Sequence, residues 1–221
     1  MPSLLKKNKY RLLYKRRERE QIMMSRLSYM VTDYLLNRGK IEKSDREIYH
    51  YGYILLLDGL LDTILLLIFG LIIQKFVLTI FFVLVFTTTR MFSGGYHANK
   101  HWQSTLITFV SCFISVEFSE QIVASFDEKL FLILGIVICY IIFILYSPIK
   151  NSTKPIDEEN IQANKTKSLV VLSIYVFIIA FASKYNLEYS NVILVTLLEV
   201  TLLMILGIIK QRIIGMKKVV K

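Results

Sequence analysis

Residues 53–73 have the sequence YILLLDGLLDTILLLIFGLII, a long apolar stretch that contains only two charged residues, both aspartates. A helix needs roughly 20 apolar residues to cross the hydrocarbon core of a bilayer, so this stretch predicts a membrane span. The composition of the whole chain agrees, because 54% of its 221 residues are hydrophobic, 20% are charged and the mean hydropathy is +0.52. We therefore predict an all-α integral membrane protein.

Five further apolar stretches follow and bring the predicted number of membrane segments to about six. They cover residues 76–89, 105–116, 130–146, 168–183 and 192–209. The stretches 76–89 and 105–116 are shorter than the range of about 17–25 residues that is typical of a span. These two are therefore either short spans or re-entrant segments shielded by protein.

The first 50 residues form a basic region, with 13 Lys and Arg against 6 Asp and Glu. Within residues 21–37 the apolar side chains recur at helical spacing, which predicts an amphipathic helix on the membrane surface. Basic residues near the surface are attracted to anionic headgroups by roughly 1 kcal/mol each. The alternative is a soluble basic tail. Nucleic-acid binding is not expected, since the sequence contains no recognisable reader motif.

The distribution of charge predicts how the chain is oriented in the membrane. Four segments are basic and together carry a net charge of +15, namely residues 1–51, 90–104, 147–167 and 210–221. Cytoplasmic segments carry the excess of Lys and Arg, so we expect both termini and the 90–104 segment at the cytoplasmic face. We accordingly divide the chain into a surface region (1–50), a polytopic membrane domain (51–210) and a basic tail (211–221).

Three acidic residues, Asp58, Asp62 and Glu199, fall inside predicted spans. A carboxylate in the bilayer is costly unless it is paired, hydrated or protonated, so such a residue is a candidate for function. Asp58 and Asp62 are four residues apart and share one helix face. The three acids could bind a basic substrate or an ion, or could neutralise a basic residue of another span.

The segment most typical of a reaction site is residues 87–104, TTTRMFSGGYHANKHWQS. Gly94 and Gly95 interrupt a helix, and two of the three histidines, His97 and His101, follow at once. Imidazole titrates near neutral pH and is a common proton acceptor in catalysis, although an interfacial His is often only a hydrogen-bonded surface residue. The two cysteines lie in apolar runs, so we expect no disulfide framework and no metal site.

Two motifs resemble those of the accessory gene regulator B (AgrB) family. Residues 90–98, RMFSGGYHA, are similar to the family signature, and residues 147–155, SPIKNSTKP, are similar to its cytoplasmic loop. The resemblance covers about residues 21–210 and implies a membrane peptidase that matures the precursor of a cyclic quorum-sensing peptide. It also implies an amphipathic precursor as partner, a homodimer and no cofactor.

The resemblance implies His97 as catalytic base and residue 104 as nucleophile, with Arg90, Gly94 and Gly95 as supporting residues. Arg90 could bind a carboxylate or an oxyanion, or could snorkel at the end of its span. Lys154 could contact the acidic tail of the precursor or lipid headgroups. Seven residues of continuous helix span about 10.5 Å, so His97 must fold back toward residue 104. If residues 97–104 were one helix, His101 would be the better neighbour.

The family nucleophile is Cys, but residue 104 is Ser. A hydroxyl without an aligned base and oxyanion site is a far weaker nucleophile than a thiolate, so we predict that Ser104 makes the chain an inactive or strongly impaired form of a cysteine endopeptidase. A natural Ser variant and a catalytically silent, peptide-binding homologue are the alternatives within the family. A small transporter or channel that uses Asp58, Asp62 and Glu199 is the alternative outside it.

Overall fold

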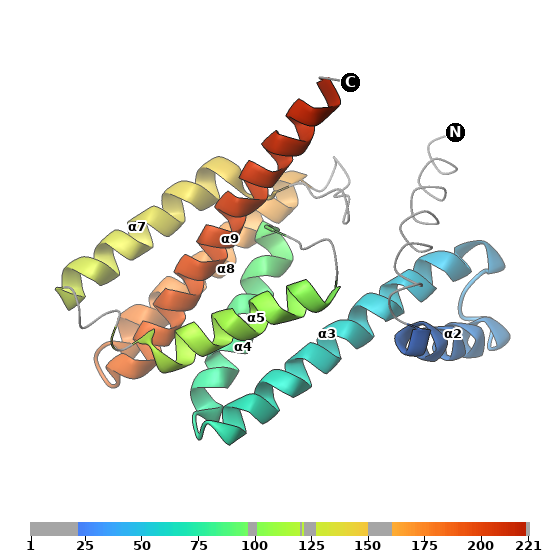
Figure 1. Cartoon of the computed structure of the whole chain (residues 1–221), viewed down its shortest axis with the longest axis horizontal. Coiled ribbons are helices and arrows are strands. Elements are labelled where there is room, and N and C mark those ends of the chain that lie inside the picture. Colours follow the sequence, from blue (N-terminus) through green and yellow to red (C-terminus); the bar gives the residue numbers. More distant parts are fainter. Residues whose placement is uncertain (1–21, 97–100, 120, 122–126, 150–160, 220–221) are drawn as a thin grey trace. The chain divides into compact units, whose positions relative to one another are not determined.

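The computed structural model describes residues 22–96, 101–119, 121, 127–149 and 161–219, and every element in these ranges is a helix (Figure 1). The elements are α2 (Ile22–Asn37), η1 (Lys43–Asp45), α3 (Arg46–Ile72), α4 (Phe76–Ser93), α5 (His101–Glu117), α7 (Glu128–Tyr146), α8 (Ile161–Ala182) and α9 (Leu187–Val219). The predicted all-α fold is confirmed. The chain divides into two compact units, Met1–Leu65 and Leu66–Lys221, which we describe separately.

Within the part of the chain that the structure describes, five helical segments are long and apolar enough to cross a membrane. They are Lys43–Ile72, Phe76–Ser93, Lys129–Tyr146, Ile161–Ala182 and Leu187–Ile213. The sixth apolar helix, α5, has 17 residues and is the shortest of the set, as its apolar stretch indicated. Helix α4 continues through the polar residues after Phe86 and ends at Ser93, so it reaches 18 residues and extends beyond its apolar stretch.

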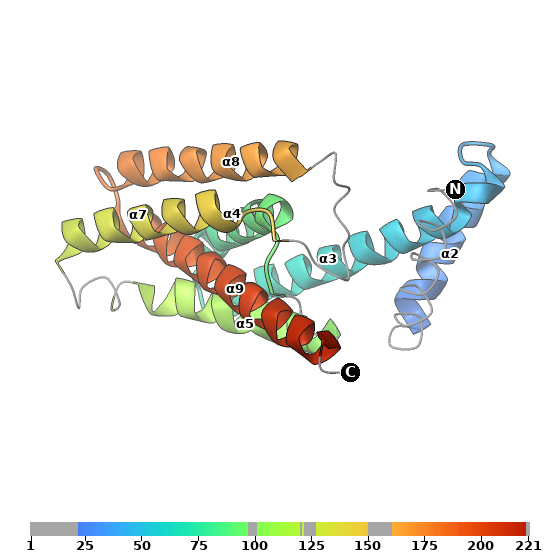
Figure 2. The same ribbon diagram turned by 90° about the horizontal axis from the view of Figure 1, so that it is seen from above.

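Helix α9 is the central helix of the second unit. It contacts α4, α5, α7 and α8, and Figure 2 shows it running between α5 and α7. In its most apolar stretch 61% of the residues are buried, against 39% or less in each of the other four candidate spans. The apolar residues that it buries, such as Leu197 and Met204, pack with Phe82, Phe143 and Leu172 from three other helices. The remaining helices therefore pack around α9.

The connections of the second unit alternate between its two ends. At one end, Lys75, before α4, forms an ion pair with Glu117, at the end of α5, with 3.3 Å between Nζ and Oε2. The ring of Tyr189, at the start of α9, lies 5.1 Å from that of Phe81 near the same end. The connection after α4 lies at the opposite end. This up-and-down order is the one that successive spans require.

In the first unit, the sequence predicted an amphipathic helix over residues 21–37, and α2 covers Ile22–Asn37. The helix ends in a Schellman motif, in which Gly39 adopts a φ of 64° and the amide of Lys40 donates to the carbonyl of Leu35. Four of its described apolar side chains are exposed, with Met30 at 69%. The exposed apolar residues of the helix are Leu27, Met30, Val31 and Tyr34. Its small polar residues are buried instead, so α2 packs through its polar face.

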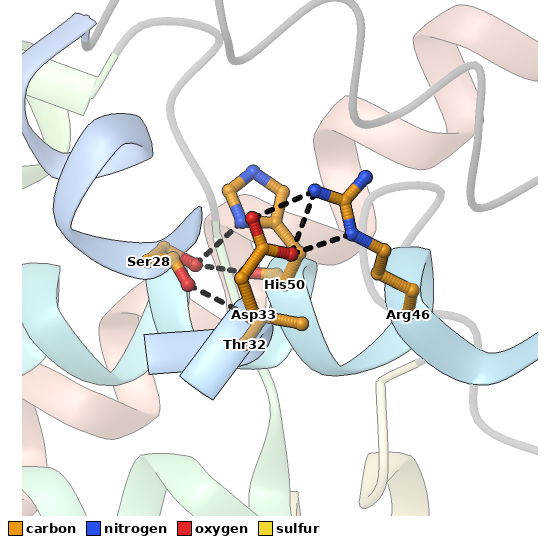
Figure 3. Close-up of polar contacts among 5 residues, drawn as sticks. All are labelled: Ser28, Thr32, Asp33, Arg46 and His50. Carbon is orange, nitrogen blue, oxygen red and sulfur yellow. Dashed lines mark hydrogen bonds and ion pairs between the residues drawn. The ribbon is translucent and has the colours of Figure 1, made fainter. Parts of the chain in front are cut away.

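A polar network joins that face of α2 to the first turns of α3 (Figure 3). The hydroxyl of Ser28 donates to the carbonyl of His50 (2.6 Å), and its Oγ lies 2.7 Å from Nδ1 of the same residue. Because Ser28 has one hydroxyl proton, both bonds form together only if Nδ1 is protonated and donates to Oγ. The His50 ring stacks on the Tyr29 ring, with 3.7 Å between the ring centres. The Arg46 guanidinium donates to the Asp33 carboxylate through Nε (2.7 Å to Oδ1) and Nη2 (3.0 Å to Oδ2).

We expect Ser28→Ala to loosen α2, because the substitution removes the Ser28 Oγ partner of the buried His50 Nδ1, and such a loss costs about 1–3 kcal/mol. Hydrogen exchange of the α2 amides in the intact protein should accelerate by about tenfold or more. Thr32→Val is the matched control. Its buried hydroxyl donates only to the carbonyl of Ser28 within the same helix. Equal exchange in the two variants would show that the Ser28–His50 contact does not hold the two helices together.

Candidate active site

The helix break predicted at Gly94 and Gly95 occurs immediately after α4. Ser93 is the last helical residue, and the amide of Gly94 still donates to the carbonyl of Arg90 (3.1 Å). Gly94 adopts φ 73° and ψ −152°, and Gly95 adopts a φ of 140°. Residues with a Cβ rarely adopt either conformation. The two glycines therefore allow the chain to leave α4 abruptly, in what we call the 94–96 segment (Gly94, Gly95 and Tyr96).

Helix α9 contacts the 94–96 segment through backbone atoms. The amide of Tyr96 donates to the carbonyl of Leu203 at 2.8 Å. One turn further along α9, a Cβ built on Gly207 would lie 2.9 Å from the nitrogen of Tyr96 and 3.0 Å from the carbonyl carbon of Gly95. No side chain fits at Gly207 unless the 94–96 segment moves, so glycine at this position is what allows the close approach.

Two cations contact Tyr96. The Nη2 of Arg90 donates to the carbonyl oxygen of Tyr96 at 2.5 Å, and the guanidinium lies 5.1 Å from the centre of the Phe86 ring. The Nζ of Lys210, on α9, lies 4.6 Å from the centre of the Tyr96 ring. Arg90 was a candidate for binding a substrate carboxylate or an oxyanion. In this structure its guanidinium binds the backbone of the 94–96 segment through Nη2, and its proposed role toward a substrate stays a prediction.

The two sequence motifs meet at the same end of the bundle. The amide of Ile149, in the second motif, donates to the carbonyl of Ser93 at 2.9 Å. A Cβ on Gly94 would lie 2.7 Å from the carbonyl oxygen of Ile149. The hydroxyl of Ser147 lies 2.7 Å from that of Ser168 on α8, which fixes the start of the second motif. Lys154, the substrate-binding candidate of this motif, lies outside the described residues.

The structure only partly describes the candidates for catalysis. His97 lies outside the described residues, and His101 is the first residue of α5, with its side chain outside them. Ser104 lies in the first turn of α5, where it is half-buried and its carbonyl accepts a hydrogen bond from Thr108 Oγ1 at 3.0 Å. The proximity of His97 and Ser104 therefore stays a prediction.

The two cysteines of the chain lie in the core of the second unit. Cys112 on α5 and Cys139 on α7 are free thiols with no exposed surface, and the thiol of Cys139 accepts a hydrogen bond from Thr201 at 3.3 Å. Neither thiol is accessible to a peptide. The assignment of residue 104 as the nucleophile position stays a prediction.

The three acids of the predicted spans do not share one compact unit. Asp58, which is buried, and Asp62, which is half-buried, belong to the first unit. Glu199 belongs to the second, where its Oε2 accepts a hydrogen bond from Ser115 at 2.9 Å. Among the described residues, the other oxygen of Glu199 is buried without a hydrogen-bond partner. No three His, Cys, Asp or Glu side chains in the described part of the chain are grouped as a metal site.

Sequence reasoning did not identify the residues of α9 that contact the 94–96 segment. Leu203 acts through its backbone carbonyl, which no sequence pattern distinguishes. Gly207 is the single glycine of the apolar stretch 192–209, and such a glycine only hints at a close contact. Lys210 is one of the basic residues of the 210–221 segment, whose charge pattern does not predict a contact with Tyr96.

Comparisons with known proteins identify relatives. The sequence model of the family "Accessory gene regulator B" matches residues 28–208. A "Putative AgrB-like protein" of Clostridium perfringens (strain SM101 / Type A) is 28% identical over 180 residues, which cover 77% of this chain and 83% of the relative. A "Putative AgrB-like protein 2" of Clostridium perfringens (strain 13 / Type A) is 29% identical over 178 residues, or 76% and 82%. No solved structure matches the chain.

We expect Gly94→Ala to destabilise the protein, because Ala is strained at this φ and its Cβ would meet the carbonyl oxygen of Ile149. Strain of this kind costs about 1–3 kcal/mol, and each kcal/mol lowers the midpoint of thermal unfolding by about 2–4 °C in a chain of this size. Gly59→Ala is the control, since nothing lies within 4 Å of its added Cβ. Equal midpoints for the two detergent-solubilised variants would contradict the geometry.

Proposed function

The chain belongs to the accessory gene regulator B family, and from this membership we propose that it is a peptidase-type membrane protein acting on the precursor of a cyclic quorum-sensing peptide. One observation supports the proposal that the functional residues gather at one end of the helix bundle of the second unit. The signature segment and the second motif, far apart in sequence, contact each other through Ser93, Gly94 and Ile149. We propose that this end faces the cytoplasm of the cell membrane, together with both termini, since the basic segments of the sequence flank it.

In the proposed reaction, residue 104 acts in its Cys form. His97 accepts the thiol proton, and the thiolate attacks a peptide carbonyl of the precursor. The carbon–nitrogen bond then breaks, the acidic C-terminal tail leaves as an amine that takes the proton from His97, and a thioester remains on the sulfur of residue 104. A Cys or Ser side chain of the precursor attacks this thioester, closes a thiolactone or lactone ring and returns the thiol.

With Ser104 the same sequence of steps begins from a hydroxyl. A hydroxyl is a poor nucleophile at neutral pH unless a base, a group that orients the base and an oxyanion site are all aligned. We therefore propose that the Ser104 chain binds the precursor but cleaves it very slowly or not at all. The partners of this chain would be the amphipathic precursor, an anionic lipid surface and a second copy of the chain.

The proposed surface contact of α2 agrees with the side chains that it exposes. Leu27, Met30, Val31 and Tyr34 form one exposed apolar stripe, while the opposite, polar face contacts α3. An exposed apolar stripe on a helix that belongs to a membrane protein is suited to the boundary between headgroups and acyl chains. We therefore propose that α2 lies on the bilayer through this stripe.

Co-expression of the chain with its precursor tests the proposed reaction. Co-expressed with its precursor, Ser104→Cys should release the C-terminal tail, whereas the Ser104 chain should bind the precursor with at most trace cleavage, as measured by mass spectrometry. His97→Ala in the Ser104→Cys background should abolish release, because the base is lost. Cleavage that survives His97→Ala would contradict the assignment of the base, and binding without cleavage by either form would support the silent, peptide-binding alternative.

The position of α2 can be tested with a spin label in nanodiscs that contain anionic lipid. A label on Met30→Cys should be accessible to dissolved oxygen and shielded from a water-soluble nickel reagent, because it lies in the acyl region. A label on Glu42→Cys, an exposed residue after α2, should show the reverse. Equal accessibility of both labels to the nickel reagent would contradict contact between α2 and the bilayer.

A further inference from the structure

The contacts of Tyr96 point to a role for α9 in the reaction. Tyr96 precedes His97 directly, and the described contacts of its backbone come from two helices. Its amide donates to Leu203 on α9, and its carbonyl accepts from Arg90 on α4. That carbonyl belongs to the peptide bond between Tyr96 and His97, and a peptide unit is planar. The backbone is therefore held at the residue immediately before the proposed base.

The hydrogen bond from Tyr96 to α9 depends on Gly207. In a helix, the carbonyl of Leu203 also accepts the amide four residues ahead, which is that of Gly207. A carbonyl oxygen has two lone pairs, so Leu203 can accept both amides only if the second donor can reach it from the side. The missing side chain at Gly207 leaves that side open, since any Cβ there would lie 2.9 Å from the nitrogen of Tyr96.

We propose that Gly207 and Lys210 of α9 are positioning residues that place His97 for proton transfer with residue 104. Gly207 does so by admitting the backbone of Tyr96, and Lys210 by its contact with the Tyr96 ring, 4.6 Å from Nζ to the ring centre. The inference rests on the proposed function, because it requires His97 to be the base. It assigns a task at the reaction site to the last helix of the chain.

The test uses the full-length Ser104→Cys protein in nanodiscs, without precursor. The rate at which iodoacetamide alkylates the introduced thiol at position 104 is followed from pH 5 to 9, with each labelled cysteine identified by mass spectrometry, while Cys112 and Cys139 stay buried. A thiolate beside an imidazolium persists to lower pH than an isolated one. His97→Ala should therefore shift the alkylation profile to higher pH, and Gly207→Ala should shift it in the same direction.

The matched control is Gly135→Ala on α7. The atoms nearest to its added Cβ belong to the side chain of Leu194 on α9, the first at 3.1 Å, and both residues are far from the 94–96 segment in sequence. This variant adds the same methyl group at a contact with the same helix and should leave the profile unchanged. In the precursor assay, Gly207→Ala should lower kcat by about 10- to 100-fold with little change in KM, the scale expected when a catalytic group is misplaced by about 1 Å. Gly135→Ala should retain the parent kcat.

Lys210→Met covers the case in which Gly207→Ala fails to fold. It keeps most of the apolar stem, removes the charge over the Tyr96 ring and adds no bulk next to the backbone. Lys210→Met should shift the alkylation profile to higher pH, as Gly207→Ala does, but the shift should be smaller.

The outcomes separate the two proposals. If His97→Ala shifts the profile while folded Gly207→Ala and Lys210→Met do not, the positioning role is wrong and the proposed base stands. If His97→Ala leaves the profile unchanged, the proposed catalytic pair itself is wrong.

Discussion

The structure depends on how the chain satisfies its backbone polar groups where α4 ends. A break between two apolar helices near the membrane boundary leaves amides and carbonyls without helical partners, and each buried group left unpaired costs about 1–3 kcal/mol. Here the carbonyl of Ser93 binds the amide of Ile149, and both backbone polar groups of Tyr96 are bonded, one to α9 and one to Arg90. This requirement brings the two sequence motifs and the last helix to one place, and it explains why the 94–96 segment carries two glycines.

Helix α9 has two tasks that place different demands on its sequence. As the central helix, it needs bulky apolar residues such as Leu197 and Met204, which are fully buried. Where it meets the 94–96 segment, it needs the opposite, a position with no side chain, and Gly207 supplies it. The same helix therefore changes from packing through side chains to packing through backbone within about one turn.

Hydropathy predicted most of the fold because bilayer thickness fixes the length of an apolar helix. It missed the last turn of α4, residues 90–93, since the polar Arg90 is helical and bonds to the carbonyl of Tyr96, a neighbour that the sequence does not reveal. The Gly94–Gly95 break was predictable, because two glycines weaken a helix wherever they occur. The role of Gly207 was not, since a lone glycine carries no information about which backbone approaches it. The pairing of His97 with Ser104 stays a prediction.

The polar contact between α2 and α3 has a consequence for handling the protein. Helical hairpins of water-soluble proteins hide their apolar residues where the helices touch and present polar groups to solvent. This hairpin has Ser28 and His50 at the junction and Leu27, Met30 and Tyr34 on the outside. We therefore expect a fragment excised around α2 and transferred to plain buffer to bury that exposed side by self-association.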